Sequence, residues 1–226
     1  MQQLDEAALK QWIEESIANS ANILAAGYQG QILHYEDADN DFLIKVPHGR
    51  GLARKFHLKM LRHEYEVYKK LGDFDGTPRC HGLVDDQYLV LEYVNGRTIR
   101  KKRPLDEDEF HARLFDYIRA MHAKGVAHMD LKRKDNLLVK ADETPCIVDF
   151  GAAVIKKQGY HPLNQYHYRL AKQFDYNAWI KHKYHDRSPD EISMADRKYY
   201  KVTWIEALAS MTKGAYTKIT GKSRFE

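Results

Sequence analysis

The sequence has only two cysteines and lacks any long run of apolar residues. Cys80 and Cys146 lie far apart without the paired spacing of a metal site, so the simplest interpretation is two reduced thiols in a cytoplasmic protein. No apolar stretch approaches the roughly 18 residues that a membrane-spanning helix requires, so we expect no transmembrane span. The first residues carry Asp5, Glu14 and Glu15 in a helical pattern, unlike the basic and then apolar pattern of a signal peptide.

Neither sign of charge is in large excess, since the net charge is only +4 over 226 residues. With 43% hydrophobic and 30% charged residues, the composition is that of a globular chain with enough apolar material for a core. The mild positive excess favours an anionic partner only weakly, and we expect no nucleic-acid binding. We expect a single domain over residues 1–226.

Two motifs dominate what is present. Residues 128–136 read H-M-D-L-K-R-K-D-N, and residues 149–151 read D-F-G. Apolar runs adjoin both motifs, at 137–139 and 146–148. This arrangement predicts a β-hairpin whose ends present polar residues to a cleft.

The side chains in these motifs suit one kind of chemistry. In-line phosphoryl transfer from ATP needs a carboxylate beside the acceptor hydroxyl and oxygen ligands that hold Mg²⁺ against the phosphates. Asp130 can supply the carboxylate, and Asn136 and Asp149 can supply the ligands. Each motif alone occurs by chance in many proteins, but their order and strand context favour a common site.

Upstream, a glycine pattern is compatible with phosphate binding. Gly27, Gly30 and Ile32 match the pattern G-x-G-x-x-G-x-V, with Ala25 in place of its first glycine. Glycine suits such a loop because backbone N–H groups must approach phosphates closely. The same spacing also marks an ordinary hairpin.

A lysine stands inside the apolar strand expected at residues 41–47. Lys45 requires a partner for its charge there, and Glu64 on the helix expected at 54–71 is the candidate. Glu66 is the rival, but it should point to another face of the helix. The alternative is that Lys45 extends along a strand edge to solvent.

Two further regions complete the expected core. Residues 78–94 predict a hairpin of two apolar strands, and a plain sheet edge is the alternative interpretation of this segment. Residues 105–125 predict a helix, with Asp106 capping its start and Gly125 ending it.

Three further segments remain. We expect a structural role for one of them, and two roles are open for each of the others. Residues 5–20 predict an amphipathic packing helix without chemical groups. The basic run 97–103 is either solvated surface or a site for an anionic acceptor. In residues 197–226, the near-helical spacing of Tyr200, Trp204, Leu208 and Met211 favours a last packing helix, and its basic end allows peripheral membrane contact.

The glycine pattern, Lys45, Glu64 and the motifs at 128–136 and 149–151 follow one another along the chain. Their types and order resemble those of the eukaryotic-type protein kinase superfamily over about residues 22–155. The resemblance implies an α+β, protein-kinase-like fold of two lobes. The N-lobe would span residues 1–94, with an N-terminal helix and a small antiparallel sheet, and the C-lobe 95–226 would be helical and shortened. ATP would bind between the lobes, with Mg²⁺ as its cofactor.

The resemblance also implies a role for each matching residue. Asp130 would orient the acceptor hydroxyl and accept its proton, and Lys132 would neutralise the transferring phosphoryl group. Asn136 and Asp149 would bind Mg²⁺. The nucleotide would contact Gly27, Gly30, Ile32, Lys45, Glu64, Glu92 and Val94, while His128, Phe150, Gly151 and Asp175 would support the site structurally.

The chain also departs from that family. Met129 replaces the arginine that grips a phosphorylated activation loop, so we expect no switching by loop phosphorylation. No A-P-E follows Gly151, and only a short stretch separates it from Asp175. The trimmed C-lobe resembles RIO-type kinases and bacterial lipopolysaccharide-core (Kdo and heptose) kinases.

The residues therefore predict an enzyme, an ATP- and Mg²⁺-dependent kinase acting on a hydroxyl. Lys132 resembles the residue of Ser/Thr protein kinases, which favours a protein acceptor. A glycolipid sugar hydroxyl is the alternative acceptor, and a nucleotide-binding pseudokinase scaffold is the alternative function.

Overall fold

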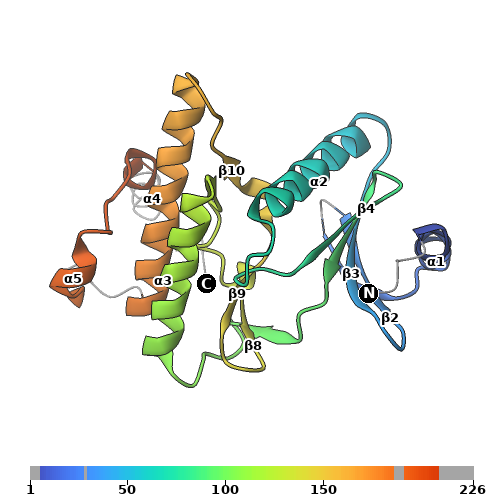
Figure 1. The fold of residues 1–226 in the computed structure, drawn as a ribbon, viewed down its shortest axis with the longest axis horizontal. Helices are drawn as coiled ribbons and strands as arrows, with labels where there is room; N and C mark the ends of the chain where they lie inside the picture. The colour runs from blue at the N-terminus through green and yellow to red at the C-terminus, as the bar shows by residue number, and fades with distance from the viewer. Residues whose placement is uncertain (1–5, 28–29, 186–190, 209–226) are drawn as a thin grey trace, which may run out of the picture.

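The computed structural model describes residues 6–27, 30–185 and 191–208, and these form two lobes (Figure 1). The predicted α+β fold with a small antiparallel sheet is confirmed. No helix within the described residues is long and apolar enough to cross a membrane. The first lobe contains α1 (Glu6–Asn19), β1 (Ile23–Ala26), β2 (Gly30–Glu36), β3 (Asp41–Pro47), α2 (Gly51–Leu71), β4 (Cys80–Val84) and β5 (Tyr88–Glu92).

The five strands of this lobe form one antiparallel sheet in the order β1-β2-β3-β5-β4. Side chains of a strand alternate between the two faces of a sheet, and β3 follows that rule. Phe42, Ile44 and Val46 face one apolar core, which leaves Leu43 and Lys45 on the opposite face. The strand therefore presents Lys45 to the side of the sheet where α2 packs.

The two helices of this lobe cover opposite faces of the sheet, as Figure 1 shows. Leu9 and Ile13 of α1 complete the outer core, together with Leu33 and the apolar residues of β3 and β5. Val67 and Leu71 of α2 instead join the core that continues into the second lobe. The predicted packing role of the first helix is confirmed.

The second lobe is built on two long helices that run side by side, α3 (Glu107–Ala123) and α4 (Pro162–Tyr184) (Figure 1). Asp106 caps α3 by accepting a hydrogen bond from the backbone N–H of Glu109 at 2.9 Å, and Gly125 follows its end with a φ of 78°. Leu105 was expected within this helix but is exposed outside it, because the cap comes after it.

Short elements connect the helices near the junction of the lobes. They form the sheet β6-β8-β9, which contains the predicted hairpin, and the pair β7–β10. Their bounds are β6 (Gly96–Thr98), β7 (Val126–Ala127), η1 (Lys134–Asn136), β8 (Leu137–Lys140), β9 (Pro145–Ile147), η2 (Phe150–Ala152) and β10 (Val154–Ile155).

After α4, the described chain contains α5 (Met194–Arg197) and a helical turn at 204–208. Tyr200 packs against the core of the second lobe, whereas Trp204 and Leu208 are exposed. Met211 and the basic residues after it lie outside the described residues, so the predicted membrane contact of this segment stays a prediction.

The docking of α1 generates a stability prediction. Ile13 is fully buried and Ile17, one turn further along the helix, is 36% exposed. We expect Ile13→Ala to lower the free energy of unfolding by about 2–5 kcal/mol, because a cavity is left in the outer core. Ile17→Ala should lower it by about 1 kcal/mol or less. Urea unfolding measures both values, and equal losses would contradict the docking of α1.

A buried histidine generates a pH prediction. His111 of α3 is 1% exposed, and neither ring nitrogen has a hydrogen-bond partner among the described residues. Burial, helped by the nearby positive charges of His182 and His185, lowers the pKa of His111 to about 3 from 6.5. The unfolded chain therefore binds a proton at about pH 3–6.5 that the folded chain does not bind.

Stability should consequently fall as pH is lowered through this window, by up to about 1.4 kcal/mol per pH unit for this one group. His111→Leu removes the titrating ring, so its free energy of unfolding should depend less steeply on pH between 6 and 4. Urea unfolding of both proteins at several pH values measures the two slopes. Identical slopes would show that His111 does not titrate in this way.

Candidate active site

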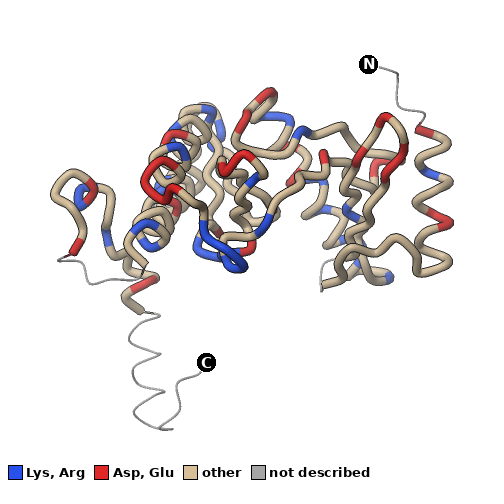
Figure 2. The backbone as a smooth tube through the Cα atoms, turned by 90° about the horizontal axis from the view of Figure 1, so that it is seen from below, with Lys and Arg blue, Asp and Glu red and all other residues tan. Residues whose placement is uncertain are grey.

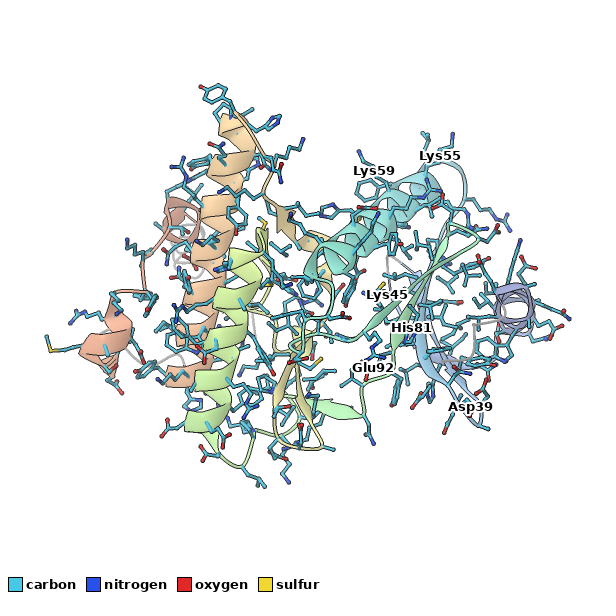
Figure 3. All side chains as sticks on the ribbon, viewed as in Figure 1. Asp39, Lys45, Lys55, Lys59, His81 and Glu92 are labelled. Atoms are coloured by element: carbon cyan, nitrogen blue, oxygen red, sulfur yellow. The ribbon has the colours of Figure 1, made fainter. Side chains whose placement is uncertain are left out.

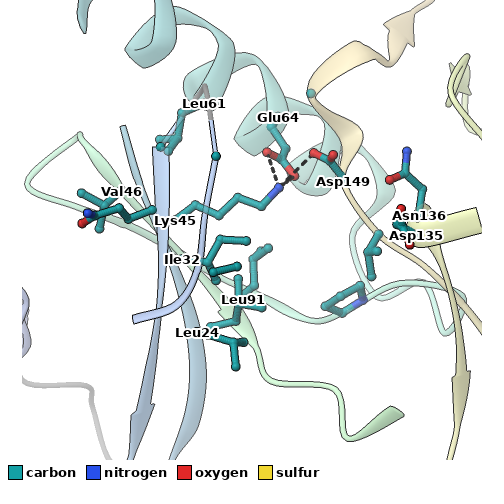
Figure 4. A pocket seen from close by; sticks show the side chains of 18 of the residues that line it. Leu24, Ile32, Lys45, Val46, Leu61, Glu64, Leu91, Asp135, Asn136 and Asp149 are labelled. Atoms are coloured by element: carbon teal, nitrogen blue, oxygen red, sulfur yellow. Dashed lines mark hydrogen bonds and ion pairs between the residues drawn. The ribbon is translucent and has the colours of Figure 1, made fainter. Parts of the chain in front are cut away.

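A cleft of about 770 Å³ lies between the sheet of the first lobe and the β8–β9 hairpin (Figure 4). One part of its wall is apolar, with Leu24, Ile32 and Leu91 from the sheet and Leu138 from β8. The backbone that links the two lobes, from Glu92 to Val94, also lines it. The cleft thus offers an apolar slot beside exposed backbone groups.

The other end of the cleft is charged. The Lys45 ammonium nitrogen lies 2.7 and 3.0 Å from the two Glu64 carboxylate oxygens and 3.1 Å from Oδ1 of Asp149 (Figure 4). The structure therefore contains the expected Lys45–Glu64 pair. Glu66, the rival partner, is exposed and lies within 3.4 Å of Lys69. Three segments that are distant in sequence meet at one ammonium group.

These charges reinforce one another. Burial disfavours the Lys45 ammonium, but the charges of Glu64 and Asp149 outweigh burial, so the pKa of Lys45 is raised. Burial likewise raises the pKa of Asp149, but the charge and hydrogen bond of Lys45 outweigh it and the net shift is downward. At neutral pH the site thus holds one ammonium group between two carboxylates, which leaves a net negative charge.

The donor set at this end suits a hard cation such as Mg²⁺. Asn136 lines the cleft next to Asp149, and its side-chain N–H donates to the Asp130 backbone oxygen at 3.0 Å and to its Oδ2 at 3.3 Å. The amide oxygen accepts no hydrogen bond within the part of the chain that the structure describes. One carboxylate and one free amide oxygen in a net negative site are ligands of the kind that Mg²⁺ takes.

A buried carboxylate fixes the loop that carries Asp130. Asp175 of α4 is fully buried and accepts hydrogen bonds from the backbone N–H groups of His128 and Met129, both at 2.8 Å. The His122 ring donates to the same carboxylate at 2.9 Å. Met129 has a φ of 70°, which is uncommon for a residue with a side chain, and the Asp175 bond holds it there.

Packed rings connect this loop to α2. Phe150 lies between His128 and Tyr68, with ring centroids 4.7 and 5.2 Å apart. The Phe150 backbone N–H donates to Glu64 Oε1 at 3.2 Å. The ring of His63 also bonds the Ala153 carbonyl at 2.7 Å, a contact that no sequence motif indicated. Gly151 lines the cleft beside these groups.

Two residues of the 128–136 loop differ from expectation in their position. Lys132 is exposed and does not line the cleft, although it lies two residues from Asp130. Arg133, which the sequence did not single out, lines the cleft and comes within 3.8 Å of Asp130 Oδ2. A guanidinium group therefore stands where the loop faces the cleft.

The two glycines of the first hairpin have different surroundings. A Cβ atom on Gly30 would lie 2.1 Å from the backbone oxygen of Val46 in the paired strand β3. A Cβ atom on Gly27 would meet no described residue within 4 Å. Strand packing thus explains Gly30, whereas Gly27 borders open space in the cleft, where a ligand can approach the backbone.

The comparisons with known proteins agree with this geometry. A family model described as "Protein kinase domain" matches residues 28–195. "Serine/threonine-protein kinase D" of Synechocystis is 27% identical over 101 residues, which cover 42% of this chain and 20% of that protein. "Stress-activated protein kinase JNK" of Drosophila melanogaster is 33% identical over 113 residues, 48% of this chain and 30% of that protein.

These alignments span less than a third of either relative. The family match, in contrast, covers most of this chain and includes β2 to α4 and most of the residues that line the cleft, but not α1 or β1. The chain therefore belongs to the protein kinase family.

Proposed function

We propose that this chain is an ATP- and Mg²⁺-dependent phosphotransferase that moves the γ-phosphate of ATP to a hydroxyl group, as a Ser/Thr protein kinase. The observation that carries the proposal is the meeting of Lys45, Glu64 and Asp149 at one end of an apolar cleft. Asn136 lines the cleft beside them and bonds Asp130. A site for charged phosphates and a site for an adenine ring are thereby adjacent.

In this proposal the nucleotide lies along the cleft. The adenine ring packs between Ile32 and Leu138, and its edge bonds the backbone of Glu92 to Val94. The Glu92 side chain is already engaged, since it accepts a hydrogen bond from the Arg79 backbone N–H. The Lys45 ammonium, held by Glu64, binds the phosphates, and the backbone at Gly27 and Gly30 covers them.

Asn136 and Asp149 would hold Mg²⁺ in the proposed enzyme. Held there, the metal would supply positive charge that neutralises the phosphate oxygens. Lys45 bonds Oδ1 of Asp149, which orients this carboxylate toward the cleft. Asp149 itself has a left-handed backbone conformation with a φ of 66°, which the packing of Phe150 behind it supports.

The acceptor hydroxyl is proposed to bind beside Asp130. The amide of Asn136 holds the Asp130 side chain, and the carboxylate orients the hydroxyl and takes its proton. Lys132 is exposed and does not line the cleft, so its proposed contact with the transferring phosphoryl group requires its side chain to turn toward Asp130. His128, Phe150, Gly151 and Asp175 are proposed to keep this loop and the metal site in register.

The proposed lobes are residues 1–94 and 95–226, and the pairing of strands supports that division. All strands up to β5 belong to the first sheet, and β6 pairs instead with β8 of the second lobe. A glycolipid sugar as acceptor remains the alternative substrate, and a scaffold without turnover remains the alternative function.

Removing the proposed base tests for turnover. We expect Asp130→Ala to lower kcat by about two to four orders of magnitude, because the acceptor proton loses its carboxylate. Nucleotide affinity should be unchanged, since the nucleotide contacts of the cleft are intact. Steady-state kinetics and ATP titration measure the two quantities.

Asp39→Ala is the matched control, because Asp39 is an exposed carboxylate on the turn between β2 and β3 (Figure 3). The control should retain full activity. If the wild-type protein bound nucleotide but were as inactive as Asp130→Ala, the scaffold function would replace the enzyme.

The two glycines offer a second test. Gly27→Ala places a methyl group in open space where the phosphates are proposed to lie, so KM for ATP should rise several-fold with unchanged stability. Gly30→Ala places it against the Val46 oxygen, and the free energy of unfolding should fall by about 1–3 kcal/mol. Kinetics and urea unfolding distinguish them. An unchanged KM for Gly27→Ala would argue against phosphates at this hairpin.

A further inference from the structure

Two basic segments that are distant in sequence are joined at the loop that carries Asp130. One is the run 97–103 and the other is residues 132–134 of the loop that carries Asp130. Figure 2 shows Lys and Arg gathered densely in one part of the second lobe. We call the two segments together the basic face, and their basic residues are Arg97, Arg100, Lys101, Lys102, Arg103, Lys132, Arg133 and Lys134.

Backbone and side-chain bonds join the two segments. Strand β6 pairs with β8, so that Arg97 lies opposite Val139, and the backbone N–H of Ile99 donates to the Leu137 oxygen at 3.0 Å. The Arg100 guanidinium donates to Asp135 Oδ1 at 2.8 Å. Asp135 directly precedes Asn136, so this bond attaches Arg100 to the residue next to a proposed metal ligand.

The arginines of the basic face are engaged in ion pairs. Arg97 bonds Glu143 at 2.8 Å, and Arg103 lies 3.3 Å from Glu107. These contacts, like that of Arg100, hold the segment in place. An ordinary structural role explains them.

The lysines are different. Lys101, Lys102, Lys132 and Lys134 form no ion pair with any residue that the structure describes, and the first three are exposed. The basic face has eight basic residues and contacts four carboxylates, those of Glu107, Asp130, Asp135 and Glu143. The excess positive charge repels itself and is unfavourable for the protein alone. An anionic partner bound at the same surface attracts these charges, so the electrostatic energy becomes favourable. The gathered lysines therefore favour a ligand of negative charge next to the acceptor site.

We propose that the basic face binds acidic residues that flank the target Ser or Thr of a protein acceptor. The inference rests on the proposed function and names its substrate class. A protein is favoured over other anions because the chain belongs to the protein kinase family and its curated relatives are named Ser/Thr protein kinases. Complementary charge steers such an acceptor toward Asp130, and a basic acceptor is repelled.

The test compares three synthetic peptides that each contain one Ser, flanked by Asp and Glu, by uncharged residues, or by Lys and Arg. For the wild-type protein we expect kcat/KM to be about tenfold higher for the acidic peptide than for the uncharged one. This preference should shrink as the salt concentration rises, because salt screens exposed charges.

The variant Lys101→Glu/Lys102→Glu should lose most of that preference, mainly through a rise of about tenfold in KM for the acidic peptide. Its KM for ATP should not change. Lys55→Glu/Lys59→Glu carries the same change of charge on exposed residues of α2 in the other lobe (Figure 3) and should behave as wild type.

A preference for the uncharged or basic peptide would overturn the proposal, and so would equal effects of the two double variants. Phosphorylation of an anionic glycolipid fraction in place of all three peptides would overturn the protein acceptor. Failure of the proposed function has a separate signature, which is the absence of ATP turnover with every acceptor.

Discussion

The contact on which the structure depends is the Lys45 ammonium between the carboxylates of Glu64 and Asp149. An unpaired charge in such a half-buried place is unfavourable by several kcal/mol, so each of the three groups requires the others. Their backbones belong to β3, to α2 and to the segment before η2. The need of the Lys45 charge for partners therefore holds α2 against the sheet. It also holds both of them against the second lobe, and the cleft lies between these parts.

Buried polar groups extend this constraint into the second lobe. Asp175 holds the backbone of residues 128 and 129, and the ring stack of His128, Phe150 and Tyr68 connects that loop to α2. The segment between β10 and α4 is held as well, because Asn164 bonds the backbone of both Ile155 and Lys157. Contacts within the chain thus hold the loop that carries Asp130 and the segment after β10. They do so although Met129 stands where the family has an arginine.

The features that the sequence predicted correctly depend on local chemistry. The cap of α3 at Asp106, the β8–β9 hairpin and the pairing of Lys45 with Glu64 follow from periodicity, turn residues and the need of a charge for a partner. Other features depend on segments that meet only in the folded chain. These are the contact between His63 and Ala153, the position of Arg133 at the cleft, and the close approach of β3 that excludes a side chain at Gly30. No short-range pattern contains that information.

The loop after Asp130 is an example of a position that the folded structure decides and residue counting does not. Five residues separate Asp130 from Asn136, whereas the kinase pattern H-R-D-x-x-x-x-N has four between its aspartate and asparagine. Counting from Asp130 would place Asp135 at the position of the metal ligand. In the folded loop both Asp135 and Asn136 line the cleft, but the Asp135 carboxylate accepts a hydrogen bond from Arg100, and Asn136 is the residue that bonds Asp130. The longer loop thus has an amide that bonds Asp130 and, directly before it, a carboxylate that bonds Arg100 of the basic face.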